Sequence, residues 1–448
     1  MQKTARLGSL LLLVLLFAER GAGRSHKNAV PFFAAHWSPD AFGTAITQVA
    51  AVSTFESARI YYKTFTPTPA DLLACFKQKV DRTVFREQGG VKGVLGYIPE
   101  DLGDYYLHGQ IQNTPSRITH SLRTADVVVI NSLPMLSHGA GQCKGTSHAS
   151  RQGEVFEWVE KNKRHLMLRP TLFSCTSWTC KVSVSPKNSL TLAEINATVL
   201  INELNGEWMP HTDSFTKCHT GHPECKWTGQ MDKHNNKIFN PPAHESNVTR
   251  KHYGIPIPYS AHHSIPRPAL VGAKTKQFLF IGSLRAEKVR STLASVAEEP
   301  GVFLEVTGLT STKKRKDKSR KHLVSSYANL TQSATFCFVP RGDTPSSRRL
   351  FDAIISGCLP VIISDAIDIH LPFSSTIPYE DFAFRIKEDD WIQDPKVVLQ
   401  QLRTVSADEL QQRRTIMAKC APYIDWLAGE NVLALIVSEL LAGRQRLF

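Results

Sequence analysis

The sequence lacks an Asp-x-Asp motif, and it lacks a hydrophobic run long enough to cross a membrane as an ordinary helix. An Asp-x-Asp pair often holds Mg²⁺ or Mn²⁺ against phosphate groups, so its absence excludes that kind of metal site. The first apolar stretch, from Leu7 to Ala18, has about twelve residues, whereas a transmembrane helix needs about twenty. This length excludes a full spanning helix in that stretch.

The N-terminal segment has the pattern of a secretory signal. Lys3 and Arg6 precede the apolar stretch, and small residues follow at positions 21–23, so residues 1–24 are typical of a cleaved signal peptide. An uncleaved short signal anchor is the alternative. Both place the rest of the chain in the secretory lumen, in agreement with three N-glycosylation sequons, which are at Asn196, Asn247 and Asn329.

Nine cysteines in an oxidising compartment are expected to pair and to leave one unpaired. Cys175 with Cys180, and Cys218 with Cys225, are close enough in sequence to form local disulfides. The second pair lies in the segment CHTGHPEC, whose two histidines also allow a zinc site. Zinc sites normally draw their ligands from two separated segments, which favours the disulfide.

The net charge of +13 would suggest a nucleic-acid partner for a cytosolic protein. The secretory signal argues against such a partner, and we expect none. The densest basic run, from Lys313 to Lys321, is interpreted either as a solvated loop or as a binding site for an anionic polysaccharide.

A strand–helix–strand unit is predicted near the C-terminal third of the chain. Thr335 to Val339 is a β-branched and aromatic run, a helix capped by Ser346 or Ser347 extends to Gly357, and Leu359 to Ile363 forms a second strand. Ligands of such βαβ units bind at the C-terminal ends of the strands. The residues expected there are Arg341, Gly342, Ser347, Arg348, Arg349 and Asp352.

This set of residues suits a nucleotide. A helix N-terminus with nearby guanidinium groups attracts phosphate, and Asp352 can accept hydrogen bonds from ribose hydroxyls. The alternative is a solvated basic turn in which Asp352 forms a structural ion pair with Arg348 or Arg349. Cys337 and Cys358 are expected on adjacent strands, where a disulfide would tie the nucleotide-binding loop to its helix.

The same segment resembles the exostosin-type glycosyltransferases. It reads FCFVPRGDTPSSRRLFDAIISGCLPVIISD, followed by LPF and IPYEDF, against a family pattern FCLxPxGxxxxSxRLxEAxxxGCIPVIxxD. Asp352 stands where many members have Glu, and Tyr379 where many have Trp. Weaker resemblance extends upstream to Ala58. It includes FLFIGSLRAEKVRSTL, with Gly282 and Arg285 expected at the diphosphate, and SLRTADVVVINSLP, expected to be a helix followed by a strand.

The resemblance implies an α/β fold of two Rossmann-like domains facing a cleft, known as GT-B, with a C-terminal helix that returns to the N-terminal domain. We place an acceptor-side domain at residues 25–265, a nucleotide-sugar domain at residues 272–395 and C-terminal helices at residues 396–448. A chain of this length is expected to form two domains.

The resemblance also implies the activity. The protein is expected to move a hexose or pentose from a nucleoside-diphosphate sugar, UDP-linked by preference, to a glycan hydroxyl with inversion, in the Golgi lumen, at the Golgi membrane or in the ER. No metal or other cofactor is expected, because arginines and the helix N-terminus would neutralise the leaving diphosphate. If the basic run binds the acceptor glycan, an anionic glycan is expected. A homo-oligomer or a complex with another transferase is compatible with this family.

The general base and the donor sugar are not set by the motif. Glu100, Asp101 and Asp104 cluster beside aromatic residues that can stack on sugar rings, and His165 and Asp213 are weaker candidates. Two alternatives to an enzyme remain at this point: a non-catalytic partner subunit with the same fold, and a secreted polyanion-binding protein.

Overall fold

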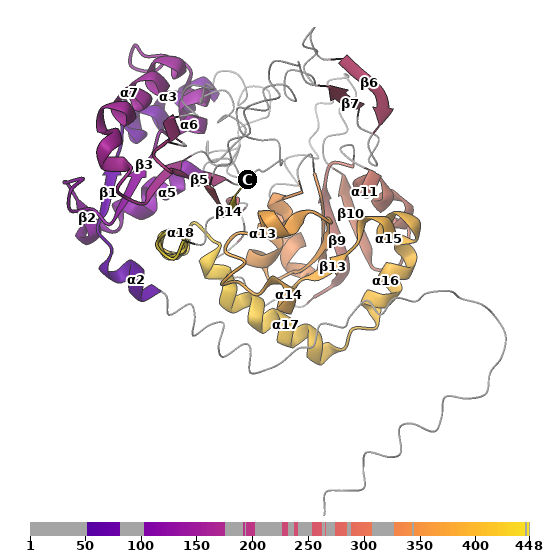
Figure 1. Cartoon of the computed structure of the whole chain (residues 1–448). Coiled ribbons are helices and arrows are strands. Elements are labelled where there is room, and N and C mark those ends of the chain that lie inside the picture. The colour runs from indigo at the N-terminus through magenta and orange to yellow at the C-terminus, as the bar shows by residue number, and fades with distance from the viewer. Residues whose placement is uncertain are drawn as a thin grey trace, which may run out of the picture. The chain divides into compact units, whose positions relative to one another are not determined.

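The computed structural model describes residues 52–80, 103–174, 191–192, 194–201, 226–231, 237–240, 253–261, 265, 274–284, 288–306, 327–342, 345–443 and 446–447. In this part of the chain the strands form two parallel sheets and a separate two-stranded ribbon of β6 (Lys226–Met231) and β7 (Lys237–Asn240). Figure 1 shows the elements in chain order.

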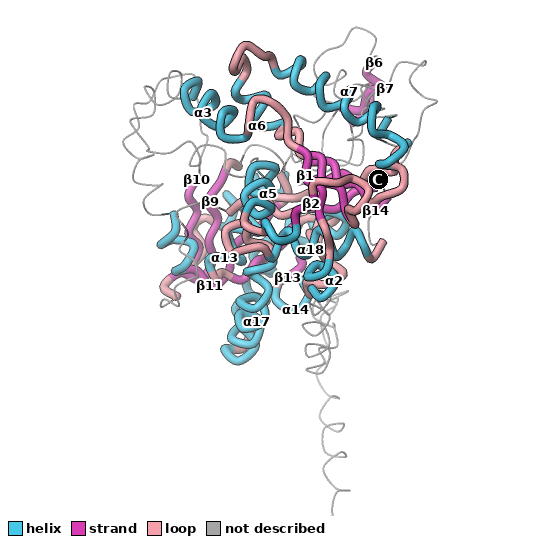
Figure 2. The backbone as a smooth tube through the Cα atoms, turned by 90° about the vertical axis from the view of Figure 1, so that its left-hand side faces the viewer, coloured by secondary structure: helices cyan, strands magenta, loops and turns pink. Residues whose placement is uncertain are grey.

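The first sheet contains seven described strands in the order β14-β8-β5-β4-β3-β1-β2. Their bounds are β1 (Ile60–Lys63), β2 (Ile118–Thr119), β3 (Val127–Ile130), β4 (Thr171–Ser174), β5 (Thr198–Ile201), β8 (Tyr253–Pro256) and β14 (Arg446–Leu447). All neighbours are parallel except β14 and β8. Strand β3 reads Val-Val-Val-Ile and is buried at every residue, as expected for a parallel strand covered on both faces. Figure 2 shows strands of this sheet in magenta.

Helices precede β1 and connect strands of the first sheet. They are α2 (Val52–Ser57), α3 (Pro69–Val80), α5 (Gly103–Gln112), α6 (Pro134–Ala140) and α7 (His148–Leu166), with a short 3₁₀ helix η5 (Pro115–Arg117). Val155, Phe156 and Val159 of α7 share a buried cluster with Phe173 and Ile130 of the sheet. A disulfide between Cys75 and Cys143, which the sequence pattern did not predict, joins α3 to the loop after α6.

The second sheet contains five parallel strands in the order β10-β9-β11-β12-β13. Their bounds are β9 (Lys276–Gly282), β10 (Val302–Val306), β11 (Ala334–Pro340), β12 (Leu359–Ile363) and β13 (Phe384–Ile386). Numbered along the chain, this order is 2-1-3-4-5, one of the two common doubly wound arrangements. The direction of winding reverses between β9 and β11, so the carboxyl ends of those two strands are the expected place for a ligand.

The helices of the second sheet are α11 (Lys288–Ser291), α13 (Arg348–Ser356), α14 (Tyr379–Phe382), α15 (Glu388–Gln393), α16 (Pro395–Arg403) and α17 (Ala407–Cys420), with the 3₁₀ helices η8 (Thr292–Val296), η9 (Ile367–His370) and η10 (Ala421–Tyr423). Stacked rings of Phe278, Phe336 and Phe338 form part of the core between them. Trp391 is fully buried beside Phe338. The predicted strand at positions 359–363 is confirmed with its bounds.

The C-terminal helices divide between the two sheets. Helix α17 contacts α13, α14 and β12 of the second sheet, whereas α18 (Asn431–Leu441) contacts α2, α5 and β8 of the first. Gln110 of α5 fixes this return: its side-chain amide donates to the carbonyl of Trp426 at 2.9 Å and accepts from the N–H of Leu433 at 2.8 Å. Figure 1 shows α18, in yellow, beside α2, in indigo.

The predicted fold class, two Rossmann-like α/β domains with a returning C-terminal helix, is thus confirmed. Apart from its edge strand β14, the first sheet is formed by strands between residues 60 and 256. The second sheet is formed by strands between residues 276 and 386. The domain boundaries themselves stay predictions, as does the cleft.

One predicted element is wrong. Residues 121–125 were expected to end a helix that leads into β3, but they form turns, and the preceding helix α5 ends at Gln112. Asp126 fixes this turn instead, because its carboxylate accepts from the backbone N–H of Arg59 at 2.8 Å and from the guanidinium of the same residue. These bonds tie the start of β3 to the start of β1.

The Cys337–Cys358 disulfide is confirmed, but its place differs from the prediction. Cys337 lies in the middle of β11, and Cys358 follows Gly357 at the C-terminal end of α13. The bond therefore joins the strand to the end of the helix, opposite the predicted nucleotide-binding turn. Within the described residues Cys420 is an unpaired, buried thiol.

No helix in the described ranges is both long and apolar enough to traverse a bilayer. Several predicted residues lie outside the described part of the chain: Glu100, Asp101, Asp213, Arg285, Cys175, Cys180, Cys218, Cys225, Asn247, the run 313–321 and the segment 1–24.

Candidate functional site

Helix α13 starts at the C-terminal end of β11, as the sequence predicted. Ser347 has extended backbone angles and is the N-cap, and its hydroxyl oxygen accepts from the N–H of Arg349 at 3.4 Å. Gly357 ends the helix in the left-handed region, with φ of 75°. Because α13 follows β11 and packs on β11 and β12, its first turn lies at the carboxyl edge of the second sheet, the edge at which doubly wound sheets bind ligands.

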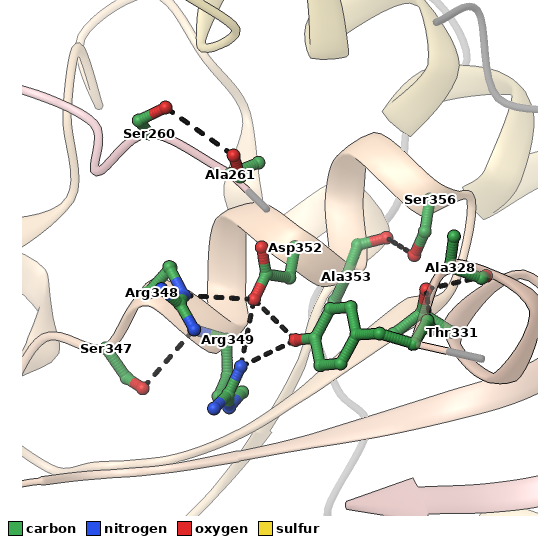
Figure 3. Close-up of polar contacts among 11 residues, drawn as sticks. Ser260, Ala261, Ala328, Thr331, Ser347, Arg348, Arg349, Asp352, Ala353 and Ser356 are labelled. Atoms are coloured by element: carbon green, nitrogen blue, oxygen red, sulfur yellow. Dashed lines mark hydrogen bonds and ion pairs between the residues drawn. The ribbon is translucent and has the colours of Figure 1, made fainter. Parts of the chain in front are cut away.

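The side chains of Arg348 and Arg349 converge on Asp352, one turn further along the same helix (Figure 3). Arg349 Nη1 lies 3.0 Å from Asp352 Oδ2, and Arg348 Nε lies 3.4 Å from the same oxygen. The hydroxyl of Tyr327 completes the cluster: it donates to Asp352 Oδ2 at 2.5 Å and accepts from Arg349 Nη1 at 2.5 Å. We call these four residues the Asp352 cluster.

The Asp352 cluster keeps both guanidinium groups charged at neutral pH. Burial lowers the pKa of Arg348 to about 10, a shift that the carboxylate of Asp352 partly offsets. Burial also opposes the charged form of Arg349, but the contacts with Tyr327 and Asp352 outweigh it and raise the pKa of Arg349. Burial raises the pKa of Tyr327, so its phenol stays protonated. The Asp352 cluster therefore has two positive charges and one negative charge, and its net charge is positive.

Asp352 also has structural contacts, while its predicted contact with a ribose stays a prediction. Asp352 is only 1% exposed, and one of its oxygens is held by Tyr327 and by both arginines. A ribose hydroxyl that bound this same oxygen would have to displace one of these partners. The alternative, a structural ion pair, is the arrangement that the structure shows, and it includes both arginines. Asp352 holds the two cations in place, while their side chains stay about one-fifth exposed.

Arg341 adds a third cation at the end of β11. Its Nη1 lies 3.8 Å from Glu388 Oε2, and its carbonyl accepts from Arg290 Nε at 2.7 Å. Glu388 is in turn held by Asp365, since the N–H of each residue donates to the carboxylate of the other. Sequence reasoning selected Asp365 as part of the family pattern but missed Glu388 and Tyr327, which lie outside that pattern.

The two glycines predicted at the site are buried, and one has a structural explanation. Gly282 ends β9, where an added Cβ would lie 2.8 Å from the ring of Phe280. Only a residue without a side chain fits there unless the ring moves. Gly342 follows Arg341 and is also buried.

Two of the predicted candidate bases, Asp104 and His165, are among the described residues, and both lie in the first domain. Asp104, in the first turn of α5, has no exposed surface, and its Oδ1 accepts from the N–H of Tyr105 at 2.8 Å. A general base must touch the acceptor hydroxyl, so this burial argues against Asp104 in that role. His165, the weaker candidate, is exposed in the last turn of α7.

The sequons at Asn196 and Asn329 are exposed, the first in a turn and the second in the helical residues 327–333. In the described residues no group of three or more His, Cys, Asp or Glu side chains is arranged to hold a metal ion. The described residues at the predicted anion site are arginines and a capped helix turn.

Comparisons with known proteins identify the family to which the chain is similar. Residues 103–402 match the family model of the Exostosin GT47 domain. A probable arabinosyltransferase of Arabidopsis thaliana is 36% identical over 94 residues, which cover 21% of this chain and 20% of that protein.

Two further relatives match over a shorter segment. A probable glucuronosyltransferase of Oryza sativa subsp. japonica is 47% identical over 74 residues, and a probable β-1,4-xylosyltransferase of Arabidopsis thaliana is 46% identical over 74 residues. Each of these matches covers 16% of this chain and 17% of the relative. The chain thus spans a fifth or less of the length of these three curated relatives.

Proposed function

The chain belongs to the exostosin GT47 family, and we propose that it is a glycosyltransferase that moves a sugar from a UDP-sugar to a glycan hydroxyl, with inversion and without a metal ion. The probable activities of the relatives, arabinosyl, glucuronosyl and xylosyl transfer, support this class of reaction. The observation that carries the proposal is the Asp352 cluster at the capped start of α13.

This cluster suits a leaving diphosphate for an electrostatic reason. The dipole at the start of α13 favours an anion, and two guanidinium groups are held in advance at the same turn. Because Asp352 and Tyr327 fix Arg349, little reorganisation is needed when negative charge develops on the diphosphate. Preorganised charge of this kind contributes several kcal/mol to catalysis, on the order of 3 kcal/mol for each donor.

The reaction itself is a single displacement. The acceptor hydroxyl loses its proton to a base, its oxygen attacks the anomeric carbon from the face opposite UDP, and the bond between that carbon and the diphosphate oxygen breaks. UDP leaves with the electron pair of that bond and is held by Arg341, Arg348 and Arg349. We assign the base to Glu100 or Asp101, since Asp104 is buried.

The test is a transfer assay on the full chain. UDP-linked glucuronic acid, xylose, arabinose, galactose and N-acetylglucosamine are offered with β-1,4-xylohexaose and with an oligogalacturonide. We expect one donor to release UDP at a rate that depends on the acceptor. A protein that binds UDP-sugars without transfer would be a non-catalytic partner subunit. A protein that binds the oligogalacturonide but no UDP-sugar would be a secreted polyanion-binding protein.

Removal of metal ions with EDTA tests the metal-free mechanism directly. Because arginines take the place of a metal in the proposal, we expect the transfer rate in excess EDTA to equal the rate without it. The measurement is UDP release before and after EDTA, with Mn²⁺ added back at the end. Loss of activity in EDTA with full recovery in Mn²⁺ would contradict the metal-free mechanism.

The same proposal locates the protein in the secretory pathway, in the Golgi lumen, at the Golgi membrane or in the ER. Asn196 and Asn329 are exposed, so we expect both to carry N-glycans. Enzymatic removal of N-glycans should then lower the apparent mass of the protein. Asn196→Gln and Asn329→Gln should each lower the mass of the untreated protein by one N-glycan. An unglycosylated protein from a secreting eukaryotic cell would contradict this location.

A further inference from the structure

A second polar cluster lies in the first domain, at the carboxyl edge of the sheet. Tyr62 is on β1, Asn131 directly follows β3, and His108 is on α5. The hydroxyl of Tyr62 lies 3.1 Å from Asn131 Nδ2 and 2.8 Å from His108 Nδ1. We call these three residues the His108 triad.

The orientation of Asn131 is fixed by its other contacts. Its Oδ1 accepts from the N–H of Leu133 at 3.2 Å, and its Nδ2 donates to the carbonyl of Asp104 at 2.8 Å. The nitrogen that faces Tyr62 is therefore a donor, and the Tyr62 oxygen accepts from it. Asn131 is 1% exposed, so no water competes for this amide in the folded chain.

The Tyr62 proton then selects the tautomer of His108. A phenol has one proton, and in the described part of the chain the acceptor available to it is His108 Nδ1. Burial raises the pKa of Tyr62, so the phenol keeps its proton, and burial lowers the pKa of His108, so the imidazole is neutral at neutral pH. A neutral ring that accepts at Nδ1 carries its own proton on Nε2.

The location of the triad is a second, independent observation. Read from β2 to β8, the strand order of the first sheet along the chain is 2-1-3-4-5-8, so the winding reverses between β1 and β3. Tyr62 and Asn131 stand at the carboxyl ends of those two strands, the place where open α/β sheets bind ligands. His108 is half-buried there, next to the rings of Tyr62 and Tyr105.

We infer that His108 is a substrate-positioning residue, whose Nε2–H donates a hydrogen bond to an oxygen of the acceptor glycan. This rests on the proposed function. Within the described ranges Nε2 has no protein partner, so its N–H can serve a ligand. The same tautomer excludes His108 as the general base, because Nε2 already carries a proton. Sequence reasoning missed His108, whose only signal was its position one helical turn after Asp104.

Paired substitutions test the inference. In His108→Ala the donor is lost, and we expect the KM for the acceptor to rise about tenfold while the KM for the UDP-sugar is unchanged. In His108→Gln the side-chain amide can place an N–H near the position of Nε2, so most of the loss should be recovered. Gln112→Ala, at an exposed position of the same helix α5, is the matched control and should behave as the parent. All rates are measured with whichever acceptor, xylohexaose or the oligogalacturonide, gives the higher rate with the parent protein.

A spectroscopic measurement tests the tautomer separately. Nitrogen-15 NMR of histidine-labelled protein should show His108 as the Nε2–H form, assigned by its absence in His108→Gln. Tyr62→Phe removes the phenol that selects this form, so both tautomers should appear and the acceptor KM should rise with the UDP-sugar KM unchanged. A proton found on Nδ1 in the parent would overturn the inference.

The kinetic outcomes separate this inference from the proposed function. If the parent transfers sugar and His108→Ala keeps the parent KM for the acceptor, the positioning role is wrong while the function stands. A rise in both KM values that His108→Gln does not reduce would mean a structural role and would also overturn it. If the parent transfers no sugar at all, the proposed function fails and the positioning role falls with it.

Discussion

Arg349→Ala lowers kcat for sugar transfer by about 100-fold to 1,000-fold, the loss typical of a preorganised donor at a developing anion. Arg349 is chosen because its guanidinium is held by both Tyr327 and Asp352, at 2.5 and 3.0 Å, and yet is partly exposed at the start of α13. Its charge is therefore both fixed and accessible to a diphosphate. The measurement is steady-state transfer of the preferred sugar, corrected for the folded fraction of each variant.

Two variants control for this result. Arg385→Ala removes a guanidinium from β13 that pairs with the exposed Asp368, and we expect kcat to stay within twofold of the parent, since surface pairs contribute roughly 1 kcal/mol or less. Arg349→Lys keeps the charge but loses the planar fork, so its kcat should lie between those of the parent and Arg349→Ala. Full activity in folded Arg349→Ala would remove this residue from the mechanism.

Asp352→Ala has the largest expected effect on stability. The substitution leaves the guanidinium groups of Arg348 and Arg349 without their shared carboxylate, and removal of one partner of a buried pair costs about 3–5 kcal/mol. The phenol of Tyr327 loses its acceptor as well. For a domain of this size the loss corresponds to a melting temperature roughly 10 °C lower. The measurement is thermal unfolding followed by circular dichroism.

The matched control for Asp352→Ala is Asp368→Ala. Asp368 also pairs with an arginine, but its side chain is 68% exposed, so we expect little change in melting temperature. Asp352→Asn should lie between the two, because it keeps one oxygen as an acceptor but loses the charge. An Asp352→Ala protein that melts like the parent yet no longer binds UDP would restore the ribose role and contradict the structural one.

Local sequence patterns were sufficient for the centre of the second domain. The run from Thr335 to Val339, the cap at Ser347, the apolar helix and the left-handed Gly357 each act within a few residues, so the strand–helix–strand unit could be predicted close to its observed bounds. The prediction failed before β3, where residues 121–125 form turns. There the ion pair between Arg59 and Asp126, 67 positions apart, determines the local structure.

The sequence by itself determined where the arginine-bearing helix turn lies, because a capped turn that follows a buried strand and carries two arginines is a local property of positions 335–357. Only the tertiary structure decided what Asp352 does, since its partner Tyr327 comes from a helix before β11 and buries the carboxylate. The same holds for His108, whose tautomer depends on Tyr62 and Asn131 from two neighbouring strands. Periodicity and capping report neighbours along the chain, whereas hydrogen bonds between distant segments depend on how the strands are ordered in the sheet.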